Sequence, residues 1–147
     1  MIVDSLLEFA DGEDISQSAG TYLATNQIDL QEARDMGNGQ PLYLVIQIDA
    51  AVTSGGSATV QFRLRSDSTA AIHATTSTAH TDTGAIAVAT LVAGYTQVIP
   101  LPLEGESYER YLGVQAIVAT ATTTAGTYSA FLTLDPIGWK AYPDATN

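Results

Sequence analysis

The stretch that decides the fold is ATVQFRLR, residues 58–65. Apolar and polar side chains alternate strictly along it, which is typical of a half-buried antiparallel strand, because successive side chains of a strand point to opposite faces. The alternation predicts that Phe62 lies at the centre of a core-facing row. It also predicts that Arg63 and Arg65 project together from the outward face.

Three further alternating segments surround this stretch. Residues 42–49 alternate before it, and the intervening Ser54-Gly55-Gly56-Ser57 is typical of a tight reversal, since glycine tolerates positive φ angles. We therefore expect a β-hairpin here. Residues 111–119 and 128–135 repeat the pattern, and the link 120–127 contains Ala125-Gly126, so the sequence predicts a second hairpin.

Four weaker strand candidates complete the pattern, at residues 2–9, 21–30, 86–90 and 95–101. Helical periodicity is nearly absent, and residues 30–36 are expected to form a loop with at most one helical turn. About eight strands without an amphipathic helix predict an all-β fold, an antiparallel jelly-roll-like β-sandwich. An immunoglobulin-like sandwich is the alternative.

The domain organisation follows from length and from the absence of any internal repeat or linker. Residues 1–147 fit one β-sandwich domain, with a non-regular C-terminal tail at 136–147. Residues 66–84 form the longest segment without periodicity, which predicts either a surface arm that orders against a neighbour or a plain loop excursion.

Composition excludes several classes of function. Five Lys and Arg stand against 16 Asp and Glu, a net charge of -11, which disfavours attraction to nucleic acid or to an anionic membrane surface. No cysteine is present for a disulfide, a thiolate metal site or a cysteine nucleophile. No apolar run approaches the roughly 20 residues of a membrane span. The first residues lack the basic start of a secretory signal, so we expect synthesis in a cytoplasm.

The candidate catalytic residues are two histidines in the aperiodic segment. His73 and His80 could pair with a serine and with Asp82 in a hydrolase triad, but no G-x-S-x-G motif occurs. As metal ligands they are seven residues apart with no obvious third ligand nearby. We therefore predict solvated loop histidines and a protein that is not an enzyme.

Two acidic clusters could be interpreted as ligand sites. Asp11-Gly12-Glu13-Asp14 offers oxygens for Ca²⁺, although EF-hand spacing is absent. Glu104, Glu106 and Glu109 could supply a glycosidase carboxylate pair, but a solvated turn explains them better. The sequence thus predicts no metal and no cofactor.

The aromatic residues leave an alternative function open. Seven Tyr and one Trp suggest a carbohydrate-binding β-sandwich module, although strand propensity alone explains the tyrosines that lie in or beside strands. Trp139 and Tyr142 differ, because they lie beyond the last predicted strand. That aromatic tail is expected either to cap its own domain or to insert into a partner.

Several short segments resemble the capsid cement proteins of tailed phages, in particular the Bordetella-phage type. In order along the chain they are MIVD at 1–4, IDL at 28–30, ARDMG at 33–37, PLY at 41–43, IAVATLVAGY at 86–95, PLP at 100–102 and ERYL at 109–112. The resemblance spans nearly the whole chain, and the predicted hairpin at Gly126 and the tail at 137–147 match least well.

This resemblance implies a virion structural protein with a jelly-roll-like fold, made in the cytoplasm of a host bacterium. Such a capsid decoration protein would bind the outer face of the capsid lattice and cement neighbouring major capsid protein subunits. Its expected partners are the phage major capsid protein and itself, as a homo-dimer or homo-trimer, with no nucleic acid and no membrane.

The expected contact residues are apolar residues near the chain ends and the outward arginines of the central strand. Unanchored chain ends are normally polar, so apolar ends suggest a partner. The predicted interface residues are Ile2, Val3, Leu6, Phe9, Arg63, Arg65, Trp139 and Tyr142.

Overall fold

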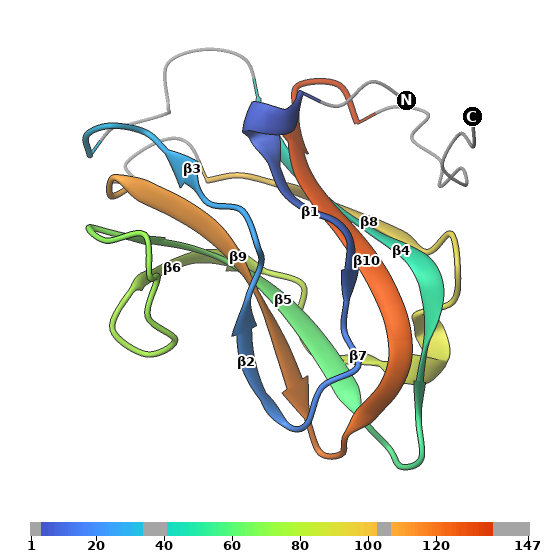
Figure 1. The fold of residues 1–147 in the computed structure, drawn as a ribbon. Coiled ribbons are helices and arrows are strands. Elements are labelled where there is room, and N and C mark those ends of the chain that lie inside the picture. Colours follow the sequence, from blue (N-terminus) through green and yellow to red (C-terminus); the bar gives the residue numbers. More distant parts are fainter. Residues whose placement is uncertain (1–3, 34–40, 103–106, 137–147) are drawn as a thin grey trace.

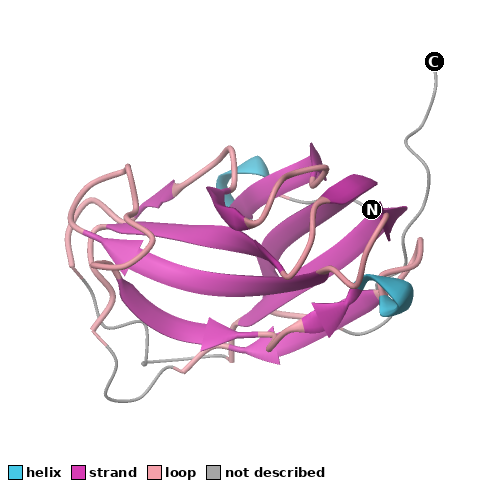
Figure 2. Cartoon of the chain, turned by 90° about the horizontal axis from the view of Figure 1, so that it is seen from below, coloured by secondary structure: helices cyan, strands magenta, loops and turns pink. Residues whose placement is uncertain are grey.

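The computed structural model describes residues 4–33, 41–102 and 107–136 (Figure 1). This part of the chain consists of β-strands, connecting loops and two single-turn 3₁₀ helices, with no α-helix (Figure 2). The elements are η1 (Ser5–Leu7), β1 (Glu8–Asp14), β2 (Gly20–Leu23), β3 (Ile28–Asp29), β4 (Tyr43–Ser54), β5 (Thr59–Asp67), β6 (Thr78–Asp82), β7 (Ile86–Ala87), η2 (Val88–Thr90), β8 (Thr96–Pro100), β9 (Tyr111–Ala119) and β10 (Thr123–Thr133).

The strands form two antiparallel sheets. Sheet A has the order β1-β10-β4-β8, and sheet B has the order β2-β9-β5-β6. Two short strands extend the edges of sheet B: β3 pairs with β9 beside β2, and β7 pairs with β5 beside β6. Each sheet therefore has four strand positions, and the chain passes repeatedly between the sheets, as in a jelly roll. The predicted fold class is confirmed; the structure has ten strands rather than eight because two edge positions are interrupted.

The core lies between the sheets and contains the apolar rows that alternation predicted. Val60, Phe62 and Leu64 of β5 are fully buried, opposite core residues of β10. The rings of Phe62 and Tyr128 lie 4.9 Å apart between centroids, so Phe62 bridges the two sheets. Its predicted place at the centre of the core is confirmed.

The first predicted hairpin is wrong. Strands β4 and β5 follow each other through Gly55 and Gly56, but β4 belongs to sheet A and β5 to sheet B. Neither glycine has a positive φ angle. A Cβ at Gly56 would instead lie 2.9 Å from the Cβ of Ala121, so close packing requires the absence of a side chain there.

The second predicted hairpin is wrong for the same reason. Strand β9 pairs with β2 and β5 in sheet B, whereas β10 pairs with β1 and β4 in sheet A. Alternation shows which face of a strand is buried but not which strand lies beside it. Both connections therefore carry the chain from one sheet to the other, and Gly126, predicted in the second link, lies within β10.

Three weaker expectations also need correction. Residues 66–84, expected to lack regular structure, contain β6, which pairs with β5. The acidic residues 11–14, considered as a calcium loop, lie within β1, where Gly12 has a φ of 59° at a register shift. Residues 2–9 form no single strand in their described part, because η1 comes before β1. The predicted tail lies outside the described residues from 137 onward.

Within the described ranges, no helix is long and apolar enough to cross a membrane.

Candidate functional site

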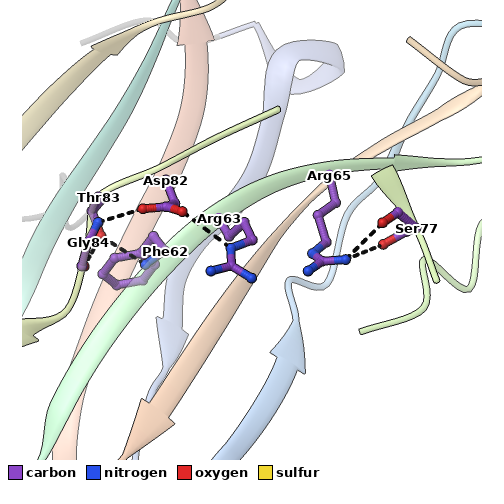
Figure 3. Close-up of polar contacts among 7 residues, drawn as sticks. All are labelled: Phe62, Arg63, Arg65, Ser77, Asp82, Thr83 and Gly84. Carbon is purple, nitrogen blue, oxygen red and sulfur yellow. Dashed lines mark hydrogen bonds and ion pairs between the residues drawn. The ribbon is translucent and has the colours of Figure 1, made fainter. Parts of the chain in front are cut away.

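The two arginines predicted to face outward both project from β5 (Figure 3), but they differ in exposure to solvent. Arg65 is 7% exposed. Its Nη1 donates hydrogen bonds to the backbone oxygen of Ser77, at 2.9 Å, and to Ser77 Oγ, at 3.0 Å. The prediction that Arg65 projects into solvent is therefore wrong.

The loop that leads from β5 to β6 covers Arg65. Ile72 of this loop is 4% exposed, and its backbone oxygen accepts a hydrogen bond from Gln115 Nε2 on β9 at 3.0 Å. Gly113 leaves room for it, since a Cβ there would lie 2.5 Å from Ile72 Cδ1. The loop thus packs on the outer face of sheet B, which period-two alternation within one strand could not reveal.

Burial has an electrostatic consequence for Arg65. Removal from water, with a smaller effect from neighbouring Arg63, lowers the pKa of the Arg65 guanidinium. No carboxylate of the described chain forms an ion pair with it, and its Nε lacks a hydrogen-bond partner there. Arg65 is a buried cation held by neutral oxygens.

Arg63 is the accessible member of the pair. Its Nε lies 3.5 Å from Asp82 Oδ2 on β6, and the two side chains are 26% and 39% exposed. Asp82 Oδ1 accepts a hydrogen bond from Gly84 N at 2.8 Å, and this bond is the largest cause of the lowered pKa of Asp82. Figure 3 shows both contacts of this carboxylate.

Hydrogen bonds from backbone and hydroxyl groups hold residues 82–84, at the end of β6, against β5. Phe62 N donates to Thr83 Oγ1, and Thr83 N donates to Phe62 O, each at 3.0 Å. Arg63 is therefore presented by a strand whose opposite face is anchored in the core. We define Arg63 and Asp82, with Gln115 opposite Arg63 in the register, as the β5 surface site.

The β5 surface site could bind a carboxylate of another molecule. Arg63 presents a planar fork of donors, and bidentate binding of a carboxylate suits that geometry. Gln115 Oε1 beside it is buried without a hydrogen-bond partner in the described ranges. The site therefore places the partly exposed guanidinium of Arg63 beside Gln115 Oε1, which accepts no hydrogen bond in the described ranges.

The two histidines do not converge on one partner. His73 Nδ1 contacts Thr75 N and Thr75 Oγ1, which is a local turn contact. His80 Nε2 lies 2.7 Å from Ser66 Oγ, and its ring stacks on Tyr108 with centroids 4.1 Å apart. His80 is the extra residue of a bulge between the β6 partners of Leu64 and Arg65, and a bulge redirects a side chain.

The contact between Ser66 and His80 resembles part of a hydrolase dyad, but its geometry does not expose a nucleophile. Ser66 is 0% exposed, and its Oγ also accepts a hydrogen bond from Glu109 N at 3.1 Å. Asp82 contacts Arg63 and Gly84. The arrangement ties β5, β6 and the start of β9 together.

The acidic clusters are used in local hydrogen bonding. Glu13 Oε2 accepts from Thr25 N at 2.9 Å, and Asp14 accepts from both N and Oγ of Ser16. Glu109 accepts from Thr78 Oγ1 at 3.2 Å, whereas Glu104 and Glu106 lie outside the described residues. In the described part of the chain, no group of three His, Asp or Glu side chains could hold a metal ion.

A cavity of about 330 Å³ opens between the edges of the two sheets, near β1 and β2. Its lining residues are Glu13, Asp14, Ile15, Gln17, Thr21, Tyr22, Leu23, Ala116 and Tyr128. Burial, with a smaller effect from Glu13, raises the pKa of Tyr128. The volume lies at the lower end of the usual range for small-molecule sites.

The remaining predicted interface residues divide into three groups. Leu6 in η1 is 77% exposed, as a contact residue requires. Phe9 is 0% exposed and belongs to the core between the sheets, so it is unavailable to a partner of the folded chain. Ile2, Val3, Trp139 and Tyr142 lie outside the described residues.

One surface feature was missed by sequence reasoning. Val45 of β4 and Phe131 of β10 are buried, although neither belongs to the core cluster between the sheets. The sequence signal is the uninterrupted apolar run LYLVI at 42–46, which places large side chains on both faces of a strand.

Comparison with known families identifies the relationship. The family described as Bbp16, named for a protein of a Bordetella phage, matches residues 9–132. The chain belongs to the Bbp16 family. This membership agrees with the resemblance found in the sequence and indicates a virion protein of a bacteriophage. No curated protein matches the chain.

Proposed function

We propose that this Bbp16-family chain is a capsid cement protein, which binds the outer face of the capsid lattice and joins neighbouring major capsid protein subunits. The family match over residues 9–132 is the observation that carries the proposal, because it covers the whole jelly roll up to Leu132 in β10. The proposed role is structural rather than enzymatic, and burial of Ser66 beside His80 supports it.

Charge supports a place on the exterior of the capsid. A net charge of -11 disfavours contact with the packaged genome, because both would be anionic. The same charge favours a partner surface that carries cations or hydrogen-bond donors. Association of this chain with itself, as a dimer or trimer, is part of the proposal.

Two described features are proposed to contact the capsid. Leu6 offers an exposed apolar side chain immediately before β1. Arg63, whose side chain is 26% exposed although its Nε is buried, offers the guanidinium of the β5 surface site, which could bind an acidic side chain of a capsid subunit. The buried Arg65 stabilises the surroundings of this site through the hydrogen bonds that its Nη1 donates to Ser77.

The test is addition of the purified chain to capsids that lack it, followed by measurement of occupancy by electron microscopy and of the temperature at which the capsids rupture. We expect saturable occupancy and a higher rupture temperature. Arg63→Gln should reduce occupancy several-fold. Absence of binding by the folded wild-type chain would refute the cementing role.

A matched control separates the Arg63 contact from a general charge effect. Arg63→Gln and Ala93→Glu each lower the net charge by one, and Ala93 is exposed after η2. Ala93→Glu should leave occupancy unchanged. Equal loss in both variants would mean that overall charge, rather than the β5 surface site, governs attachment.

A carbohydrate-binding function is the second candidate, favoured by the cavity between β1 and β2. Tyr22 and Tyr128 line it together with Glu13, Asp14 and Gln17, and sugars pack on aromatic rings while bonding to polar groups. A glycan array would test this candidate. A glycan that binds the wild type, but not a Tyr22→Ala variant, would support it.

A further inference from the structure

The cavity between β1 and β2 has a carboxylate on its inner wall. These are edge strands of sheets A and B, and residues 15–19 connect them from one sheet to the other (Figure 1). Glu13 of β1 pairs in register with Tyr128 of β10, which belongs to the core between the sheets. Paired residues of antiparallel strands have side chains on the same face. Glu13 therefore lies on the inner face of sheet A, half-buried at its edge.

The opposite wall of the cavity comes from sheet B. Tyr22 of β2 pairs with Ala116 of β9, and both residues line the cavity. Ala116 belongs to the core, but its side chain is too small to fill the space. The hydroxyl of Tyr22 donates to the backbone oxygen of Ser18 at 2.9 Å, which fixes the position of the ring. The cavity of about 330 Å³ thus has a carboxylate on one wall and an aromatic ring on the other.

The hydroxyl of Tyr128 is the observation that points to a ligand. The Tyr128 side chain is 2% exposed and lines the cavity, yet no hydrogen bond joins its hydroxyl to another residue in the described part of the chain. Burial, with a smaller effect from Glu13, raises the pKa of Tyr128, so the hydroxyl keeps its proton. A buried tyrosine hydroxyl normally has a hydrogen-bond partner. A group that enters the cavity can supply one.

The lining of the cavity carries negative charge without a cation. Glu13 Oε2 accepts a hydrogen bond from Thr25 N at 2.9 Å, and Oε1 accepts none from the described residues. Asp14 accepts hydrogen bonds from Ser16, which lower the pKa of Asp14 and keep it ionised. No described residue of the lining is Lys, Arg or His. A complementary ligand is therefore a cation that also donates hydrogen bonds.

An arginine side chain has this chemistry. Its guanidinium is a planar fork of N–H donors, which can bond to Glu13 Oε1 and to the hydroxyl oxygen of Tyr128. Guanidinium groups also pack on aromatic rings, and Tyr22 supplies one at the wall. A neutral ligand could bond to the same atoms but would leave Glu13 and Asp14 without an opposite charge.

The arginines of the described chain are engaged elsewhere. Arg63 and Arg110 lie beside carboxylates of their own chain, and Arg65 is buried. These contacts favour another protein as the source of the guanidinium. We propose that the cavity between β1 and β2 receives an arginine side chain of a major capsid protein subunit. The inference rests on the proposed cementing function and names a second, cationic contact beside the β5 surface site.

The free chain tests the chemistry of the cavity. N-acetyl-arginine amide is the probe, and N-acetyl-citrulline amide is its neutral counterpart of the same shape. We expect the arginine probe to shift the Thr25 amide signal in NMR spectra saturably, and the citrulline probe to bind several-fold more weakly. Glu13→Gln keeps an acceptor for Thr25 N and should weaken binding of the arginine probe several-fold. Asp11→Asn removes the same charge from an exposed residue of β1 outside the lining and should bind like the wild type.

A second variant guards against misfolding of the first. Tyr22→Leu keeps an apolar side chain against the core but removes the ring, and it should also weaken binding of the arginine probe several-fold. Circular dichroism confirms that each variant is folded. Equal binding of the two probes, or a glycan that shifts Thr25 when the arginine probe does not, would overturn the inference.

Capsids that lack the chain test the partner. Glu13→Gln should lower occupancy several-fold, whereas Asp11→Asn should leave it unchanged. Wild-type occupancy by Glu13→Gln, or equal loss in both variants, would overturn the inference and leave the cementing role standing. Absence of binding by the wild type would instead refute the proposed function itself, so the two failures are distinguishable.

Discussion

At the scale of single residues, Phe62 is a large side chain at the centre of the core. It is fully buried and packs on Tyr128 across the two sheets. We expect Phe62→Ala to lower the free energy of unfolding by about 3 to 5 kcal/mol, since truncation leaves a cavity. Thr59→Ala, at a half-buried position of the same strand, should cost less than about 1 kcal/mol. Urea denaturation measures both; equal losses would contradict the assigned faces of β5.

Arg65 is a buried charged residue, in contrast to the apolar Phe62, and substitutions there show what the buried charge contributes to stability. Its side chain is 7% exposed and has no ion-pair partner among the described residues, and its guanidinium donates to Ser77. We expect Arg65→Met to be within about 1 kcal/mol of the wild type or more stable, because methionine keeps the aliphatic stem and removes the buried charge. Arg65→Ala should cost about 2 kcal/mol or more. Chemical denaturation checks the order, and a Met variant as unstable as the Ala variant would show that the guanidinium is required.

The same residue shows where sequence reasoning reaches its limit. Alternation correctly placed Arg63 and Arg65 on one face of β5, opposite Phe62. It could not show that a loop folds back over that face, because the loop is positioned by contacts with β9 through Gln115 and Gly113. Whether an outward side chain of a strand is exposed depends on what packs over it from elsewhere in the chain, and the alternation within the strand does not show this.

At the scale of elements, the strands were predictable but their partners were not. The alternating segments around 42–49, 58–65, 111–119 and 128–135 all coincide with strands. Glycines near the ends of these segments suggested hairpins, yet both connections cross between sheets and Gly126 lies inside β10. Pairing in a jelly roll joins strands far apart in the chain, such as β1 with β10, and local turn chemistry carries no information about such pairs.

The short strand β3 is attached to β9 by a charged pair. Arg110 donates from Nε and Nη2 to the two carboxylate oxygens of Asp29, both at 2.9 Å. This bidentate contact, with a backbone bond from Gln31, lowers the pKa of Asp29 from 3.8 to about 2. Because the pKa is lower in the folded chain, the contribution to stability is complete above the unfolded value and is lost as pH falls through about 2.

This pair gives a prediction for acid unfolding. We expect Asp29→Asn to reduce the decline in unfolding free energy between pH 4 and pH 2, because the variant has no carboxylate to protonate at that position. Arg110→Gln should flatten the profile in the same direction, since it removes the main cause of the lowered pKa. Denaturation midpoints measured across this pH range provide the test. Wild-type slopes in both variants would show that other carboxylates govern the acid response.

At the scale of the whole molecule, the fold and the family could be inferred from sequence, whereas the binding surfaces could not. Patterning predicted the sandwich, and short segments along the chain led to the phage family that residues 9–132 match. Phe9 and Arg65 were expected at an interface because they are apolar or charged in sequence, yet the two-sheet packing buries both. The buried pair of Val45 and Phe131 went unnoticed because the two residues lie on β4 and β10, which only the tertiary structure brings together.

Truncating each end of the chain in turn separates the contributions of the two ends to capsid attachment. Deletion of residues 1–8 removes exposed Leu6, and we expect it to reduce occupancy on capsids and to lower their rupture temperature. Leu7 packs against the core, so Leu6→Asp is the matched variant that changes the surface while keeping that contact. Deletion of residues 136–147 removes Trp139 and Tyr142, the other predicted contact residues, and we expect it likewise to reduce occupancy and rupture temperature. Full occupancy and unchanged rupture with both truncations, in chains that remain folded, would exclude the ends as attachment sites and leave the β5 surface site or a sheet edge.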